Sequence, residues 1–255
     1  MQMVLGRISI RRILIGLICT MALLSGCLAV QGIWSAAKRY GAAQQVVGLA
    51  GLNKNLFDAL GAFRLERASM QSAVILPSDK NQNSINTYLL RRKLVDDAMA
   101  QANAVFAASP QPGLASVRSE LAAVYDENRK LRETVENQLK LAVENRDKQM
   151  PDQILSVGEK LLRSLDKASL TVDSEIRTLN PALTELVMAR ALAWATRTYA
   201  GTSGVMISTI TAQQRPFDAK ETRILLSNDA SALASWQALR NMADTAQTDT
   251  AIKAA

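Results

Sequence analysis

Six arginines and one tryptophan are the side chains of this sequence whose type and spacing suit ligand binding. Arg64 and Arg67 are three residues apart, and Arg190, Trp194 and Arg197 follow at steps of four and three, so each set shares one face if its segment is helical. A guanidinium offers paired N–H donors that fit a carboxylate or a planar oxyanion. The predicted lining of a small-anion pocket is Arg64, Arg67, Arg91, Arg190, Trp194, Arg197 and Arg223.

Surface ion pairs explain the same arginines without any ligand. Glu66, Asp97 and Glu185 are acidic residues near them that could pair with them on solvated helix faces. Such exposed pairs contribute little to stability. The sequence leaves both interpretations open. The run of charges at 126–132 is likewise predicted to be the solvated face of a helix.

The residue inventory argues against catalysis. The chain has no histidine, so the commonest general base and a frequent metal ligand are missing. Its two cysteines, Cys19 and Cys27, both lie inside an apolar run, and the rest of the chain has no thiol. No pair of carboxylates has a spacing that indicates acid–base chemistry. We therefore predict that the protein is not an enzyme and that it carries no metal or cofactor.

An uncharged apolar stretch at 13–37 predicts a transmembrane helix, because about 20 residues suffice to cross a hydrocarbon layer. Trp34 and Tyr40 would lie at the interface with water, where aromatic side chains collect. Three arginines precede the stretch and two basic residues follow it. This modest bias predicts a cytoplasmic segment at 1–12, a single crossing of the inner membrane, and a periplasmic remainder.

Residues Leu24-Ser25-Gly26-Cys27 allow a different interpretation of the same segment. They match the cleavage pattern of a bacterial lipoprotein, in which Cys27 would become the lipidated first residue. The apolar stretch continues directly after Cys27 with no polar tether, which favours an uncleaved helix. Both interpretations place the rest of the chain outside the cytoplasm.

The positive net charge does not indicate nucleic-acid binding, because it is concentrated near the apolar stretch. Of the 30 basic residues five lie within 1–39, where none of the 23 acidic residues lies, so that 40–255 carries a formal charge of only +2. Basic residues beside an apolar run meet lipid headgroups. We therefore expect the inner membrane, and not a nucleic acid, to be the partner of this charge.

Apolar residues recur at three- and four-residue steps through most of the remaining chain, which is typical of packed helices. Pro and Gly clusters divide this pattern. The helices are expected at 42–76, 84–107, 114–149, 151–179 and 182–214, with a last one to 242 that begins after an N-cap at Asp218. We predict an all-α fold in which a helical bundle occupies 38–245 and a disordered tail occupies 246–255.

A faint internal repeat suggests that the bundle has two related modules. Segment 57–76 aligns with 187–206 so that Arg67 falls on Arg197, and Arg91 falls on Arg223 in the following helices. Any two amphipathic helices rich in Ala, Leu and Arg align about this well. A bimodular bundle is therefore one of two open interpretations.

An N-terminal anchor, a long helix that reaches Phe63-Arg64-Leu65-Glu66-Arg67, and a later segment Ala193-Trp194-Ala195-Thr196-Arg197 resemble a known arrangement. They resemble the periplasmic sensory region of methyl-accepting chemotaxis proteins from alphaproteobacteria. They are also similar to helical nitrate- and nitrite-sensing input domains, in which a long early helix carries a comparable Glu-Arg element. The resemblance covers most of the chain, but its motifs are short.

This resemblance implies a homodimeric sensor module that binds a small molecule outside the membrane and signals through a second membrane helix. No second apolar span follows residue 242, so the expectation is a receptor sequence truncated before that helix. Two alternatives remain open. One is a periplasmic lipoprotein with a structural or adaptor role, and the other is the input domain of a sensor histidine kinase.

Overall fold

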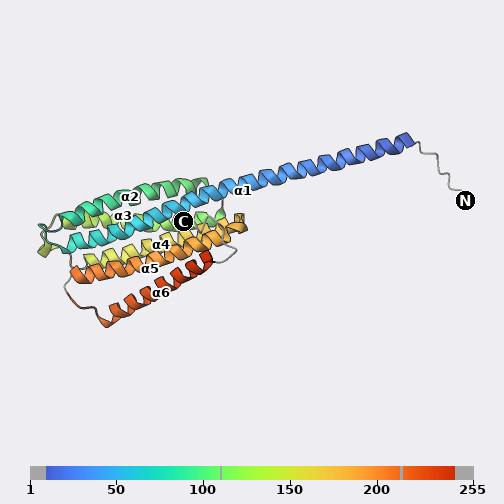
Figure 1. The fold of residues 1–255 in the computed structure, drawn as a ribbon. Coiled ribbons are helices and arrows are strands. Elements are labelled where there is room, and N and C mark those ends of the chain that lie inside the picture. Colours follow the sequence, from blue (N-terminus) through green and yellow to red (C-terminus); the bar gives the residue numbers. More distant parts are fainter. Residues whose placement is uncertain (1–9, 110, 213–214, 245–255) are drawn as a thin grey trace. The chain divides into compact units, whose positions relative to one another are not determined.

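Helices are the only regular secondary structure among the residues that the computed structural model describes, which are 10–109, 111–212 and 215–244. No strand occurs in these ranges, so the predicted all-α fold is confirmed (Figure 1). The elements are α1 (Ile10–Ile75), α2 (Gln82–Ala108), α3 (Pro112–Leu139), α4 (Met150–Leu179), α5 (Thr184–Ala212) and α6 (Ala219–Asp244), with short 3₁₀ turns η1 (Val143–Asn145) and η2 (Pro181–Leu183). The predicted tail at 246–255 and most of the predicted segment 1–12 lie outside the described residues.

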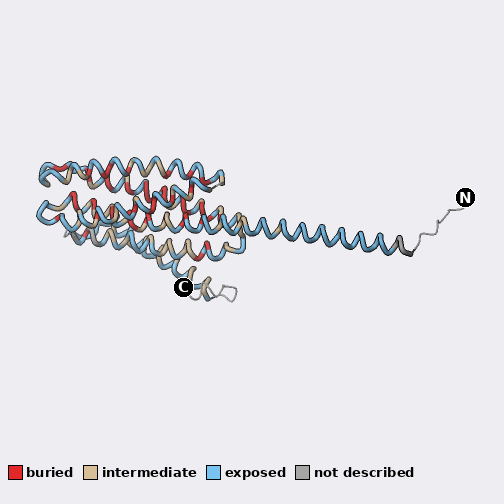
Figure 2. Tube along the Cα trace, turned by 90° about the horizontal axis from the view of Figure 1, so that it is seen from above, coloured by how far each residue is buried: buried red, intermediate tan, exposed pale blue. Residues whose placement is uncertain are grey.

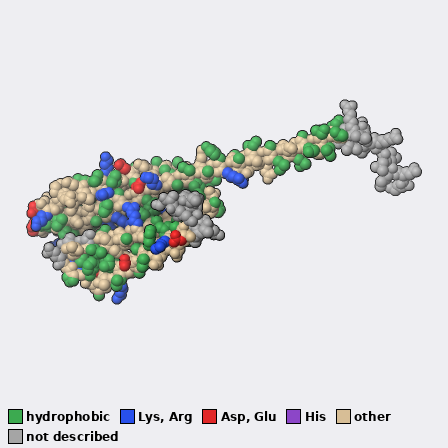
Figure 3. Space-filling view, viewed as in Figure 1, with side chains coloured by type: hydrophobic (Ala, Val, Ile, Leu, Met, Phe, Trp, Pro, Cys, Tyr) green, Lys and Arg blue, Asp and Glu red, His purple; other side chains and the backbone are tan. Residues whose placement is uncertain are grey.

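Contacts divide the chain into two units, Met1–Gln45 and Val46–Ala255. The first unit consists of the N-terminal part of α1, whose apolar side chains point outward, for example Leu23 at 69% and Leu28 at 68% exposure (Figures 2 and 3). Among the described residues, α1 is the one helix long and apolar enough to cross a membrane. The bounds predicted for the membrane segment, 13–37, stay a prediction.

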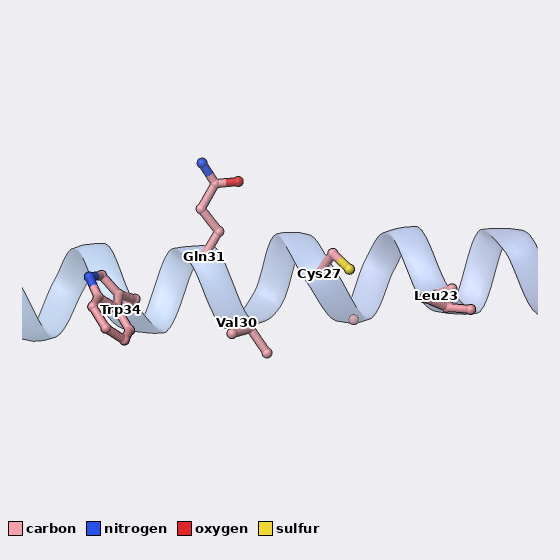
Figure 4. A pocket seen from close by; sticks show the side chains of 6 residues that line it. Leu23, Cys27, Val30, Gln31 and Trp34 are labelled. Carbon is pink, nitrogen blue, oxygen red and sulfur yellow. The ribbon is translucent and has the colours of Figure 1, made fainter.

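A shallow hollow runs along α1 in this first unit beside Leu23, Cys27, Val30 and Trp34 (Figure 4). One helix alone forms it, and its polar lining is limited to Gln31. A binding site needs walls from more than one element to enclose a ligand. The hollow is therefore the surface relief of a single apolar helix, of the kind that acyl chains cover in a bilayer.

The second unit is a bundle with two buried apolar clusters. Its larger buried cluster joins leucines of α1, such as Leu52 and Leu60, to Leu121 of α3 and Leu161 and Leu165 of α4, all at most 1% exposed (Figure 2). A smaller cluster lies further along α1, around Met70 and Val135. Burial of this apolar surface is the main source of stability. α6 packs on α5 and has no buried residue.

The predicted third helix is wrong at its C-terminal end, because α3 stops at Leu139 and not at 149. The loop that follows α3 contacts the end of α1 instead. Arg146 is 5% exposed, and its Nη1 donates to the carbonyl oxygens of Ala73, Val74 and Leu76 at 2.8–3.1 Å. Ala73 and Val74 lie in the last turn of α1 and Leu76 follows its end, where carbonyls have no partner inside the helix. A cation there also complements the helix dipole.

The start of α6 confirms the predicted N-cap. The backbone N–H of Glu221 donates to Asp218 Oδ1 at 2.7 Å, and the Asp218 backbone N–H donates to Glu221 Oε2 at 2.9 Å. This reciprocal arrangement is a capping box, which satisfies two backbone donors at once. Sequence alone therefore locates the turn between α5 and α6.

Candidate ligand-binding site

Two of the predicted arginines line one hollow of about 490 Å³ in the bundle unit. Arg91 comes from α2 and Arg197 from α5, and α1 supplies Lys54 and Gly61 between them. Residues 91 and 197 are far apart in sequence, so packing of the helices brings them to the same space. The volume lies within the range of small-molecule sites.

Small residues create this hollow. Ala62 of α1 and Ala98 of α2 are 8% and 6% exposed and line its floor. Arg197 lies across Gly61, so that its Nη2 would be 3.2 Å from a Cβ at that position. The missing side chain at residue 61 therefore gives the guanidinium room to extend over α1 toward the hollow.

The charges around the hollow leave two guanidinium groups without an ionic partner. Lys54 pairs with Asp58 at 2.6 Å. Neither Arg91 nor Arg197 makes a hydrogen bond or ion pair within the described part of the chain, and Arg91 Nε is buried without an acceptor. A buried N–H without a partner is unfavourable, and an anion would supply the missing acceptor. Asp97 adds one carboxylate to the lining.

An aromatic pair positions Arg197 at the edge of the hollow. The Phe57 and Trp194 rings lie edge to face with centroids 4.1 Å apart. The guanidinium carbons of Arg64 and Arg197 lie 5.3 and 5.4 Å from the Trp194 centroid, within cation–π range. Trp194 Nε1 also donates to Asp166 Oδ1 at 3.3 Å. Trp194 is thus a support between α1, α4 and α5 for the arginines around it.

Arg64 lies beside this support and not in the hollow. Its Nη2 donates to Thr198 Oγ1 at 3.1 Å. Burial lowers the pKa of Arg64, and the neighbouring Arg67 and Arg197 act in the same direction, whereas Asp166 opposes them. Burial also raises the pKa of Asp166. The cluster is therefore crowded with positive charge, which an additional anion would relieve.

Arg67 does not line the hollow and instead packs against α4. Its side chain is 15% exposed and crosses α4 over Gly158, where a Cβ would be 2.4 Å from Arg67 Cδ. Arg67 Nη1 then reaches Glu159 Oε2 at 3.2 Å. Gly158 thus makes the groove in which Arg67 lies.

Arg190 is likewise ion-paired, with the buried carboxylate of Asp173. Asp173 also accepts a hydrogen bond from Asn53 Nδ2 at 2.7 Å, and Ser169 Oγ donates to Asn53 Oδ1 at 2.6 Å. Burial raises the pKa of Asp173, and Arg190 opposes that shift. This network joins α1, α4 and α5.

Arg223 is exposed on α6 and lines none of the hollows beside Arg91, Arg190 and Trp194. The structure therefore brings Arg91 and Arg197 together, places Arg64 and Trp194 next to Arg197, and leaves Arg223 apart. The ion-pair interpretation holds for Arg67 and Arg190. Their partners are Glu159 and Asp173, however, and not the predicted Glu66, Glu185 and Asp97.

A buried ionic cluster in the bundle was missed by sequence reasoning. Arg132 and Glu66 are 1% and 0% exposed and form two hydrogen bonds, at 2.6 and 2.7 Å. Arg132 Nη1 also donates to Asp96 Oδ1 at 2.6 Å. The prediction that 126–132 is a solvated face is therefore wrong for Arg132, and for Asn128, which is 0% exposed.

The charge state of this cluster follows from its hydrogen bonds. Burial acts to lower the pKa of Arg132, but the bonds and charges of Glu66 and Asp96 outweigh it, so its pKa is raised. Burial also raises the pKa of Glu66, and the two bonds from Arg132 oppose this. Because arginine stays protonated in proteins, Glu66 has a permanent cation at hydrogen-bond distance.

No group of three or more His, Cys, Asp and Glu side chains suited to a metal ion occurs in the ranges that the structure describes. The hollow beside Arg91 and Arg197 is lined by three basic and two acidic side chains. Comparisons with protein-family models, with curated proteins and with solved structures find no match to this chain.

Proposed function

We propose that this chain is the membrane-anchored, extracytoplasmic sensor module of a bacterial signal transducer, and that it binds a small anion between Arg91 and Arg197. One observation carries the proposal. Two guanidinium groups without ionic partners, from helices far apart in sequence, line a single hollow. Structural arginines in this bundle, such as Arg67 and Arg132, have carboxylates instead.

The course of α1 suggests how binding is transmitted. The same helix contains the apolar N-terminal segment and the residues Lys54 and Gly61 that line the hollow. An anion held by Arg91 and Arg197 would draw α2 and α5 together across α1. Packed helices exchange between discrete arrangements, so a small shift of α1 would be passed along its hydrogen-bonded length.

The resemblance to chemoreceptor and nitrate-sensing domains supports a transducer of chemoreceptor type that acts as a homodimer. The input domain of a sensor kinase would use the same module, and the genomic sequence after residue 255 distinguishes the two. A lipoprotein would begin at a lipidated Cys27. The intact mass of protein extracted from membranes separates that form from a chain that keeps its N-terminus.

The binding test is a calorimetric titration of the full chain in lipid nanodiscs with nitrate, nitrite, acetate and succinate. We expect saturable heat with at least one of these anions. Arg91→Gln and Arg197→Gln should each weaken that binding at least ten-fold, because each removes one of two charge-assisted donors. The matched control is Arg223→Gln, which removes an equal charge from α6 and should leave the affinity unchanged.

Three results would contradict the proposed function. The first is the absence of heat with all four anions. The second is equal binding in Arg91→Gln, Arg197→Gln and the parent chain. The third is an equal loss in Arg223→Gln, which would mean that the anions respond to net charge and not to a site.

A further inference from the structure

A second hollow in the bundle unit has a different character from the first. It measures about 390 Å³, is open to solvent, and is bordered by α1, α4, η2 and α5. Its lining is mainly aliphatic: Val46, Ala50, Ile176, Leu183, Leu186 and Val187. It shares Lys54 and Phe57 with the first hollow, but every other lining residue is distinct.

Arg190 borders this aliphatic hollow with an unused donor. Its Nη2 is taken by Asp173, whereas its Nη1 is buried and has no hydrogen-bond partner. The guanidinium lies over the Phe57 ring, 4.5 Å from the centroid, which fixes its plane. One N–H group thus lacks an acceptor beside an apolar space.

The surroundings of Arg190 do not supply that acceptor. Asp173 is held in place from the other side, since its Oδ1 accepts from Asn53 at 2.7 Å and its Oδ2 accepts from Arg190 Nη2. Asn53 Oδ1 is itself occupied by Ser169 Oγ at 2.6 Å. The side chain of Arg190 is 31% exposed and borders the hollow, whereas Nη1 itself is buried.

We propose that this second hollow binds an aliphatic carboxylate. The hydrocarbon part would lie on the apolar residues of α1, η2 and α5, and the carboxylate would accept from Arg190. Lys54 also borders the hollow, but Asp58 already pairs with it at 2.6 Å. A bare inorganic anion is disfavoured here because the aliphatic walls would remove its hydration without replacing it. An amine is disfavoured because Asp173, the one carboxylate among the residues that line this hollow, already accepts from Asn53 and Arg190. This site is separate from the anion site proposed above.

The experiment measures octanoate binding to the full chain in nanodiscs by calorimetry, with empty nanodiscs subtracted. We expect saturable binding of octanoate, and none of octylamine, which has the same chain and the opposite charge. Arg190→Gln should weaken octanoate binding at least ten-fold. Ala50→Phe should abolish it by filling the hollow without touching the ion pair. Arg163→Gln is the matched control, an exposed arginine of α4 that lines neither hollow, and should bind like the parent.

Several outcomes would overturn the proposal. These are no octanoate heat above that of empty nanodiscs, octylamine binding equal to that of octanoate, or parent-like affinity in Ala50→Phe with unchanged circular dichroism. Arg91→Gln should leave octanoate binding intact, so failure at one hollow is distinguishable from failure at the other. If Arg190→Gln weakens folding, Ala50→Phe still decides the question.

Discussion

The buried pair of Glu66 and Arg132 gives the sharpest prediction about stability. Both side chains are at most 1% exposed, and two N–H groups of Arg132 reach the two oxygens of Glu66. Removal of one partner leaves the other charge in a site from which water is excluded. Breaking a buried pair in this way costs about 3–5 kcal/mol.

The two halves of the pair are not equivalent. Arg132→Met leaves Glu66 with no partner, so the full loss of about 3–5 kcal/mol is expected. Glu66→Leu leaves Arg132 bonded to Asp96 at 2.6 Å, a carboxylate that is 44% exposed. The loss should therefore be smaller in Glu66→Leu than in Arg132→Met. The double variant should be more stable than Arg132→Met alone, because it buries no unpaired charge.

The assay is urea unfolding of the full chain in detergent, followed by circular dichroism at fixed detergent concentration. The matched control is Lys167→Met, which breaks an ion pair to Glu120 whose side chains are 58% and 44% exposed. That change should cost less than about 1 kcal/mol. A loss in Arg132→Met no larger than in the control, or a double variant less stable than both single variants, would refute this reasoning.

Three further predictions concern single positions. Asn128→Leu should stabilise the bundle by about 1–3 kcal/mol in the same assay, because the amide nitrogen and oxygen of Asn128 are buried without hydrogen-bond partners. A loss of stability would show that these two atoms do have partners. Gly158→Ala should destabilise the bundle, because the new Cβ would lie 2.4 Å from the Arg67 side chain. Gly201→Ala is the control and should be neutral or stabilising, because the space around Gly201 is open. Equal changes in stability in the two variants would contradict the contact between Arg67 and Gly158. The hydrogen bond from Arg215 lowers the pKa of Glu221 from 4.5 to about 2, so its contribution to the α6 cap is complete above pH 4.5 and is lost as the pH falls toward 2. In Glu221→Gln, hydrogen exchange at the start of α6 should lose this pH dependence, and a retained dependence would assign it to another group.

Much of the fold was predictable because it depends on local patterns. The apolar spacing, the proline breaks and the Asp218 cap predicted helices close to the observed ones. The end of α3 was not predictable from spacing, since apolar residues continue past Leu139. The chain turns there because Arg146 caps the distant end of α1, a contact between segments 70 residues apart.

The sequence does contain a pattern that indicates a buried charge. Glu66 falls in a seven-residue series with Leu52, Ala59 and Ala73, all fully buried. A charged residue in the phase of buried ones predicts a buried partner. The identity of that partner, Arg132, depends on how α3 docks on α1, which no local pattern reveals.

The sequence predicted that arginines line the candidate site, but it did not predict which of them do. Spacing along one helix identifies residues that share a face, but it does not identify the helix against which that face packs. Arg91 and Arg197 line one hollow, and Gly61 leaves room for the Arg197 guanidinium over α1. Arg223 has the same chemistry, but it is exposed on α6, a helix that packs mainly on α5.

The proposed sensor function requires the bundle to face the outside of the cytoplasmic membrane. The most direct measurement is cysteine labelling in intact cells. Cys19 and Cys27 are replaced by serine, and Ser227 on the exposed surface of α6 is replaced by cysteine. A membrane-impermeant maleimide should label this variant before lysis as completely as after it. Labelling only after lysis would place the bundle in the cytoplasm and would contradict the proposed sensor.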